Sequence, residues 1–179
     1  MADLARSGLW VMRAIYVTFC LLVILAHLLP LETLPRGWAP PDYLIAFTFA
    51  WALRRPDYVP ILAIAGVFLL ADLLFQRPPG LLAALVVLGT EYLRIRFAEL
   101  RDASFAGEWI AVCVMIAAIT LANRLILSVV ASTLPPLAPS VIQMVLTMAF
   151  YPFAVLLSQS LLGVRKPDPR QAETLGARA

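Results

Sequence analysis

The stretch EWIAVCVMIAAITLANRLILSVVA, residues 108–131, decides the fold class of this chain. As a helix it is long enough to cross a bilayer, because about 20 helical residues span about 30 Å of hydrocarbon. Several further apolar stretches accompany it, and 62% of the 179 residues are hydrophobic. The mean hydropathy is +0.88, well outside the range of a soluble domain. We therefore predict an all-α polytopic membrane protein.

The apolar stretches predict six transmembrane helices, separated by proline-rich connections that cannot continue a helix. The expected spans are 9–29, 42–53, 58–75, 80–93, 108–131 and 137–162. No connection is long enough for a core of its own, so we expect residues 1–179 to form a single membrane domain, with a flexible cytoplasmic tail at 163–179. Residues 9–29 lack a cleavage site and are expected to be a retained helix. Residues 42–53 are short, and an interfacial or re-entrant segment is the alternative.

The basic residues predict the orientation of the bundle. With six spans and an internal amino terminus, eleven lysines and arginines fall inside, and only Arg36 and Arg77 fall outside. Arg124 lies within a span. This bias favours both termini in the cytoplasm, and it favours counting 42–53 as a span. The same basic loops meet anionic lipid, so the net charge of +3 does not indicate nucleic-acid binding.

Three ionisable side chains, those of Asp72, Glu91 and Arg124, lie well inside the apolar runs and away from their first residues. Asp72 and Arg124 fall at similar depths of about 21 and 24 Å, from the helical rise per residue. This match predicts an ion pair in the outer half of the bundle, with Asn123 beside it. Such an intramembrane polar cluster is either a substrate or proton site, or an interhelical clamp, and Arg124 could instead extend to the outer interface. Glu91 lies one turn before Arg94, which predicts an i, i+3 pair at the cytoplasmic interface.

The sequence contains no set of residues typical of an enzyme. His27 is the only histidine, and Cys20 and Cys113 are isolated within apolar segments. We therefore expect no catalytic residues, no metal site and no cofactor. Two small residues at 118 and 122 predict a close helix contact, and a proline within the last span predicts a kink that frees a carbonyl near residue 148.

Three groups of residues form a recurring pattern when their order and spacing are taken together. They are PDYL at 41–44 with WALRRP at 51–56, Gly66 and ADLL at 71–74 with Pro78, Pro79 and Gly80, and Tyr151 and Pro152 with the basic end at 165–166. In this arrangement the chain resembles the bacterial rod shape-determining protein MreD family over nearly its whole length. Gln76 departs from the pattern, because the family often has a glycine there.

The resemblance implies a six-helix fold like that of the substrate-binding subunits of energy-coupling-factor transporters. It implies a non-catalytic scaffold of the cell-elongation machinery in the bacterial inner membrane, acting in the regulation of cell shape. The implied direct partner is a bitopic MreC-like protein. An MreB-like filament and a peptidoglycan polymerase and transpeptidase would be indirect partners. Because a fold does not establish a function, a small-molecule (vitamin-type) binding subunit of a transporter remains the alternative.

Overall fold

The computed structural model describes residues 2–29, 39–99, 104–130 and 136–162, and helices are the only regular elements in these ranges. The six α-helices are α1 (Ala2–Leu28), α2 (Tyr43–Arg54), α3 (Ile61–Leu74), α4 (Leu81–Glu99), α5 (Phe105–Val130) and α6 (Leu137–Leu162), with a 3-10 turn, η1 (Pro56–Tyr58), between α2 and α3. The all-α prediction is confirmed. The largest differences in boundaries are at α1, which begins at Ala2 where the sequence predicted a start at 9, and at α4, which continues to Glu99 where the sequence predicted an end at 93. The predicted tail at 163–179 lies outside the described residues.

Three of the helices are long and apolar enough to cross a membrane by themselves. They are the segments Gly8–Leu28, Phe105–Val129 and Leu137–Ser160 of α1, α5 and α6. Helices α2 and α3 are apolar but shorter, with 12 and 14 residues. Helix α4 has 19 residues and carries several charged side chains in its second half. The chain therefore has the character of a helical membrane protein.

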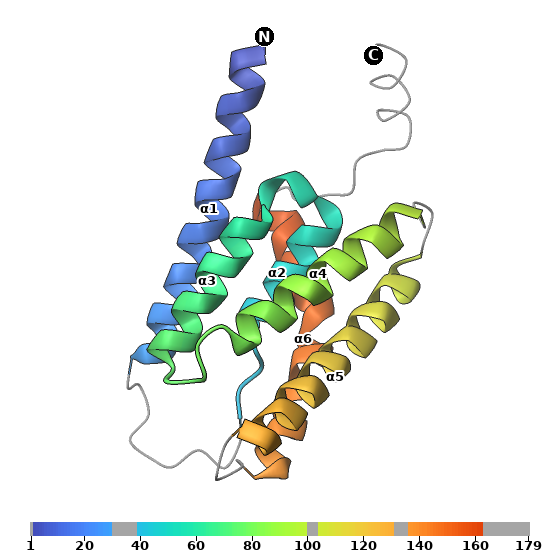
Figure 1. The fold of residues 1–179 in the computed structure, drawn as a ribbon. Helices are drawn as coiled ribbons and strands as arrows, with labels where there is room; N and C mark the ends of the chain where they lie inside the picture. Colours follow the sequence, from blue (N-terminus) through green and yellow to red (C-terminus); the bar gives the residue numbers. More distant parts are fainter. Residues whose placement is uncertain (1, 30–38, 100–103, 131–135, 163–179) are drawn as a thin grey trace.

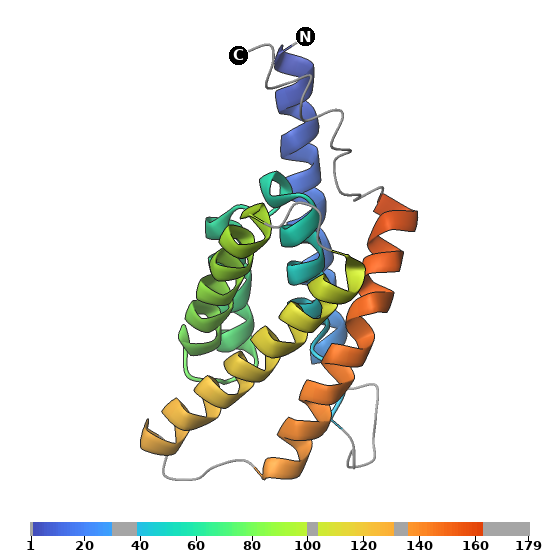
Figure 2. The same ribbon diagram turned by 90° about the vertical axis from the view of Figure 1, so that its right-hand side faces the viewer.

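Consecutive helices run in alternating directions, and the start of α1 and the end of α6 lie at the same end of the molecule (Figures 1 and 2). Helix α1 packs beside α3, and its first turns project beyond the other helices (Figure 1). The turn between α3 and α4 lies at the opposite end, where α1 finishes (Figure 1). We call the end where α1 starts the basic end, and the opposite end the far end.

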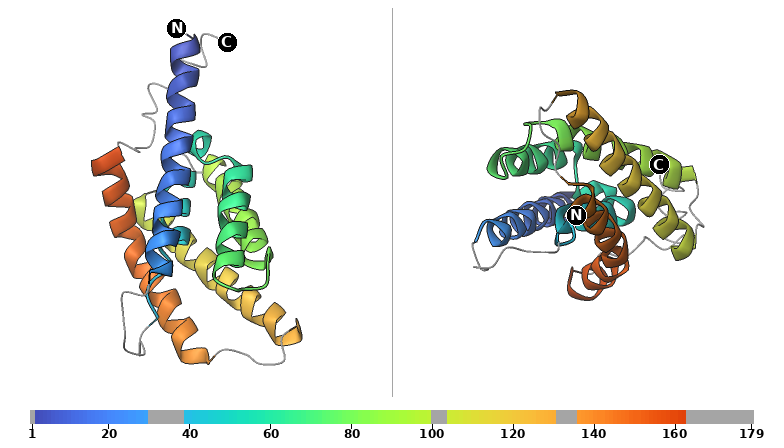
Figure 3. Two further views of the ribbon diagram at one scale, coloured as in Figure 1. Left: turned by 90° about the vertical axis from the view of Figure 1, so that its left-hand side faces the viewer. Right: turned by 90° about the horizontal axis from the view of Figure 1, so that it is seen from below.

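Helix α2 is the centre of the bundle, as the end-on view in Figure 3 shows. Every residue from 44 to 52 is buried, and α2 contacts α1, α4, α6 and η1. A 12-residue helix is only about 18 Å long, too short to cross a bilayer alone. Because protein surrounds it, its ends need not reach the lipid surface. This burial on all sides argues against the interfacial alternative for the segment.

The core around α2 is built from aromatic and small side chains. Trp51 and Tyr16 are almost fully buried, with their ring centroids 5.8 Å apart. The Tyr16 hydroxyl is 2.9 Å from the hydroxyl of Thr48, so this polar group is satisfied inside the core. Cys20 is also fully buried in this cluster, as expected for a thiol that fills space. These contacts join α1 to α2.

Helices α4 and α5 approach closely at Gly89, which the sequence analysis did not single out. A Cβ atom on Gly89 would lie 2.9 Å from the Met115 sulfur and 3.0 Å from Cδ1 of Ile119. The sequence predicted a close contact at Ala118 and Ala122 instead. Ala118 is exposed and Ala122 half-buried, because the face of α5 that turns toward α4 carries the residues around Met115 and Ile119. Sequence spacing identifies a face without identifying the neighbour it meets.

Candidate functional site

A buried ion pair joins three helices near the basic end. Nη2 of Arg54 in α2 lies 3.1 Å from Oε1 of Glu108 in α5, and the two side chains are only 6% and 1% exposed. The Tyr151 hydroxyl in α6 donates to the same carboxylate oxygen at 2.7 Å. Two buried charges are tolerated where each meets the other and hydrogen bonds are added. We call Arg54, Glu108 and Tyr151 the buried cluster.

A second polar contact ties α2 to α6 one turn away from the buried cluster. The indole N–H of Trp51 donates to the Ser158 hydroxyl at 3.0 Å. That hydroxyl in turn donates to the backbone carbonyl of Ala154 at 2.7 Å. Both side chains are buried, so the contact satisfies groups that water does not reach. Together with the buried cluster it fixes how α2 and α6 face each other.

Pro152 lies within α6 and has a defined structural consequence. Because proline has no N–H, the carbonyl of Met148 one turn earlier loses its helical partner. The indole N–H of Trp109 donates to that carbonyl at 3.0 Å. Pro152 also lines a cavity of about 420 Å³ beside Arg54 and Glu108. The predicted freed carbonyl near residue 148 is therefore a cross-helix hydrogen-bond acceptor.

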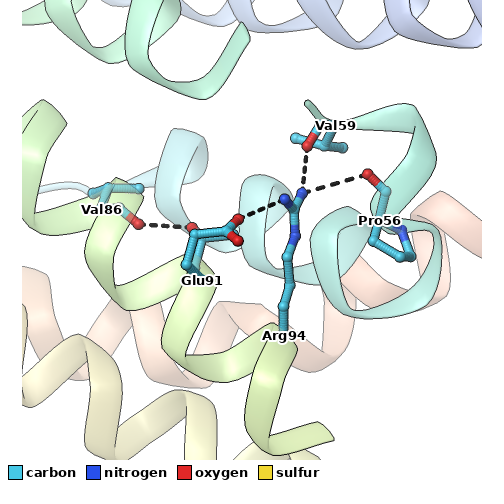
Figure 4. Close-up of polar contacts among 6 residues, drawn as sticks. Pro56, Val59, Val86, Glu91 and Arg94 are labelled. Carbon is cyan, nitrogen blue, oxygen red and sulfur yellow. Dashed lines mark hydrogen bonds and ion pairs between the residues drawn. The ribbon is translucent and has the colours of Figure 1, made fainter. Parts of the chain in front are cut away.

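The turn between α2 and α3 is held by two arginines from other helices. Arg94 forms the predicted i, i+3 ion pair with Glu91 at 2.6 Å, and the same guanidinium donates to the carbonyls of Val59 and Pro56 (Figure 4). Nε of Arg13 in α1 donates to the Asp57 carbonyl at 3.0 Å. We call these contacts the turn clamp. They give the arginines at this end a structural role in addition to any effect on orientation.

Asp72 stabilises the start of α4. It is fully buried, and its Oδ2 accepts hydrogen bonds from the backbone N–H groups of Gly80 at 3.1 Å and Ala83 at 3.3 Å. The backbone N–H of Arg77 donates to the Asp72 carbonyl at 2.9 Å, which closes the turn. Gln76 and Gly80 adopt positive φ values of 55° and 84°, a region that favours glycine. Asp72 thus acts as a cap that joins α3 to α4.

The structure does not bring Asp72 and Arg124 together. Both residues are described, yet no ion pair joins them, because the Asp72 carboxylate faces the start of α4. Nη1 of Arg124 donates to the Ser140 hydroxyl at 2.7 Å and to the Pro136 carbonyl at 3.3 Å. Helix α4 packs against both α3 and α5 and occupies the position between them. Equal depth in two helices does not make them neighbours, and the predicted pairing is wrong for this reason.

Arg124 and Asn123 instead line a cavity of about 500 Å³, which we call the far-end cavity. Asp72 is not among its lining residues. Asp42 lines it too, and its Oδ1 caps α2 by accepting from the N–H of Ile45 at 3.2 Å. The backbone N–H of Asp42 donates to the hydroxyl of Thr147 at 2.8 Å, which fixes α2 against α6. The far-end cavity is larger than the cavity of about 420 Å³ beside Arg54 and Glu108.

The remaining predicted residues differ in their surroundings. Pro78 and Pro79 are exposed in the turn before α4, whereas Gly80 is half-buried. Gly66 is exposed in α3, and nothing lies within 4 Å of the position of its Cβ, so it has no packing role inside the described chain. Sequence reasoning missed Glu108, because a carboxylate at the edge of an apolar stretch was taken as a boundary. Its distance in sequence from Arg54 gave no signal of the pair.

Within the described residues, no group of three histidine, cysteine or acidic side chains is placed to hold a metal. Comparison of the chain with protein-family models, with curated proteins and with solved structures finds no match. The fold and these sites define a class of protein at a coarse level. It is a six-helix protein of membrane character whose described buried charges join neighbouring helices, with a cavity of about 420 Å³ near the basic end and one of about 500 Å³ at the far end.

Proposed function

We propose that this chain is a non-catalytic membrane scaffold of the MreD type, acting in the cell-elongation machinery of a bacterial inner membrane. One observation carries the proposal: most of the residues behind the resemblance form contacts between elements. Asp72 caps α4, Tyr151 binds the ion pair in the bundle, and the arginine-rich turn after α2 is clamped from α1 and α4. Residues with such roles build a rigid body that can hold partners in place.

The backbone at position 76 supports the same proposal independently. Gln76 has a φ of 55°, a conformation in which an L side chain is strained and glycine is favoured. The family that the chain resembles often has glycine at this position. Gln76 therefore differs from the family's usual glycine in its side chain, while its backbone keeps the conformation that glycine favours.

We further propose six membrane spans with both termini in the cytoplasm. Arg13 and Arg94 of the turn clamp and Arg54 of the buried cluster lie toward the basic end, as expected for an inner face. Arg77 and Arg124 line the cavity at the far end. Arg36, Arg101 and the basic tail lie outside the described residues. Reporter fusions after Arg55 and after Lys166 should both signal cytoplasm, and an external signal from either would contradict the topology.

The proposed direct partner is a bitopic MreC-like protein, which offers one helix and an external stalk. Within lipid, helices associate through close packing at small residues. Gly66 is such a residue: it is exposed on α3 and has open space around its Cβ position. An MreB-like filament and a peptidoglycan polymerase and transpeptidase would be reached through this partner.

Affinity purification of the tagged chain from host membranes in mild detergent tests the proposal. We expect a bitopic protein to co-purify, and depletion of the chain to round the cells. Gly66→Leu should reduce recovery of the partner without lowering insertion or the unfolding temperature. Ala84→Leu, at an exposed small residue of α4, is the matched control. Normal recovery with Gly66→Leu would remove α3 as the partner surface.

The far-end cavity favours a second candidate, a small-molecule binding subunit of a transporter. Its volume of about 500 Å³ lies within the range of ligand sites, which is about 300–1,000 Å³. The same purification distinguishes the two candidates. Recovery of a transporter ATPase in place of a bitopic protein would replace the scaffold proposal with this one.

A further inference from the structure

The far-end cavity combines positive charge with an apolar wall. Among the described residues its ionisable lining groups are Arg77 and Arg124 and the carboxylate of Asp42. That carboxylate already accepts a hydrogen bond from the N–H of Ile45 at the start of α2, which offsets part of its charge. The described lining residues therefore carry one formal positive charge in excess, contributed by guanidinium groups that suit the oxygen pairs of carboxylates and phosphates.

The two arginines are held in different ways. Arg124 is oriented by hydrogen bonds to the Ser140 hydroxyl and the Pro136 carbonyl. Arg77 lies over the ring of Phe75, 5.3 Å from its centroid, and no carboxylate of the described chain lies within ion-pair distance of it. A guanidinium that is positioned by stacking keeps its N–H donors directed outward for an anion.

The amino termini of three helices lie at this cavity; that of α6 adds to the positive potential, whereas the carboxylates of Asp42 and Asp72 cap those of α2 and α4 and offset their partial charge. Helices α2, α4 and α6 begin there, and Ile45, Leu81 and Ser140 from their first turns line it. Helix amino termini carry partial positive charge and favour anions. The opposing carboxyl end of α3 is neutralised, because its last carbonyls accept from the N–H groups of residues 75–77.

The remaining wall is apolar. Ile116, Ile119, Leu82 and Met144 line the cavity, and Ile116, Ile119 and Leu82 are buried. A small, fully hydrated anion would leave this surface without a partner, whereas a hydrocarbon chain would cover it. The wall and the arginines therefore match the two parts of an amphiphile.

We propose that the far-end cavity binds an amphiphile with a phosphate monoester head, the phosphate between Arg77 and Arg124 and the apolar part against Ile116 and Ile119. Of the two sources of such a phosphate, a membrane lipid supplies both the head and the apolar part, whereas a small soluble organic phosphate supplies the head alone. This site is independent of the proposed scaffold function, because neither the buried cluster nor Gly66 contributes to its lining.

Thermal unfolding of the purified full-length chain in detergent, followed with three added probes, tests the site. Lysophosphatidic acid carries the phosphate monoester and one acyl chain, lysophosphatidylcholine carries the same chain with a zwitterionic head, and glycerol 3-phosphate carries the head alone. We expect lysophosphatidic acid to raise the unfolding temperature in a saturable way and chain-matched lysophosphatidylcholine to leave it nearly unchanged. Equal effects of the two lipids would overturn the proposal, since the chain would then bind without the anion.

Glycerol 3-phosphate distinguishes the sources of the phosphate. A shift as large as that from lysophosphatidic acid would overturn the amphiphile proposal, since the phosphate head alone would then account for binding, whereas a small or absent shift supports a ligand whose apolar part covers the wall of the cavity. Arg77→Gln and Arg124→Gln should each weaken binding of lysophosphatidic acid by about tenfold, from the loss of a charge-assisted contact. Arg96→Gln, at an exposed arginine of α4 outside the cavity, is the control and should bind normally. Unchanged binding in both cavity variants would overturn the assignment. If a variant fails to fold, the comparison of lysophosphatidic acid with lysophosphatidylcholine on the unaltered chain still tests whether the cavity binds the phosphate.

Discussion

The two ends of the bundle use arginine in different ways. At the basic end, Arg54 pairs with a buried carboxylate, while Arg13 and Arg94 donate to the carbonyls of one turn. At the far end, Arg77 and Arg124 line a cavity of about 500 Å³. Arg54 also lines a cavity, of about 420 Å³, but the carboxylate of Glu108 offsets its charge there, whereas no carboxylate of the described chain forms an ion pair with Arg77. The same residue type therefore has different roles according to the acceptors that tertiary structure places around it.

The largest expected effect comes from breaking the buried cluster at the basic end. Glu108→Ala leaves the Arg54 guanidinium buried without its carboxylate and removes the acceptor of the Tyr151 hydroxyl. We expect a loss of about 3–5 kcal/mol in the free energy of unfolding. Denaturant titration in mixed micelles measures it. The double variant Arg54→Met with Glu108→Met should lose less than Glu108→Ala alone, and an equal or larger loss would show that the pair itself supplies the stability.

A smaller effect is expected where the far end joins α3 to α4. Asp72→Ala removes the acceptor for the N–H groups of Gly80 and Ala83. We expect a loss of about 1–2 kcal/mol, as for a helix cap. Asp72→Asn keeps one carbonyl oxygen and should lose less. Equal losses in the two variants would indicate that the charge, and not the cap geometry, is what matters at this position.

A methyl group added at Gly89, between α4 and α5, should disturb packing beside the far-end cavity more than contacts at the basic end. Gly89→Ala places a methyl group against Met115 and Ile119, and Ile119 lines the far-end cavity. Because the ends of these side chains can shift, we expect a loss of only about 1 kcal/mol. Gly66→Ala, with open space around its Cβ, is the control and should stabilise by about 0.5–1 kcal/mol through helix propensity. Thermal unfolding of both variants checks the contrast. A destabilised Gly66→Ala would contradict it.

The smallest effect is expected at Glu91, a more exposed acidic residue toward the basic end. Glu91→Ala removes an ion pair whose side chains are 34% and 15% exposed, and Arg94 keeps its bonds to the turn carbonyls. We expect a loss below about 1 kcal/mol. Measured beside Glu108→Ala in the same titration, it tests whether burial sets the size of these effects. A loss of stability as large as that of Glu108→Ala would mean that burial of the ion pair does not set the size of the effect.

Local patterns in the sequence predicted local contacts correctly. The i, i+3 spacing predicted the pair of Glu91 with Arg94, and the missing N–H of Pro152 predicted a freed carbonyl at Met148. Both effects depend only on helix geometry, which repeats regularly along a chain. The pair predicted from depth, Asp72 with Arg124, failed because depth along an axis says nothing about which helices are neighbours.

The sequence by itself determined the all-helical class, the apolar character of the long helices and the approximate ends of most of them. These properties follow from composition and from proline positions, which act over a few residues. Only the tertiary structure decided that Arg54 meets Glu108, that α2 is buried on all sides, and that Arg77 and Arg124 share a cavity. The reason is physical: membrane helices associate through close packing and a few polar contacts, and helices of similar apolar surface have no strong sequence signal for their neighbours.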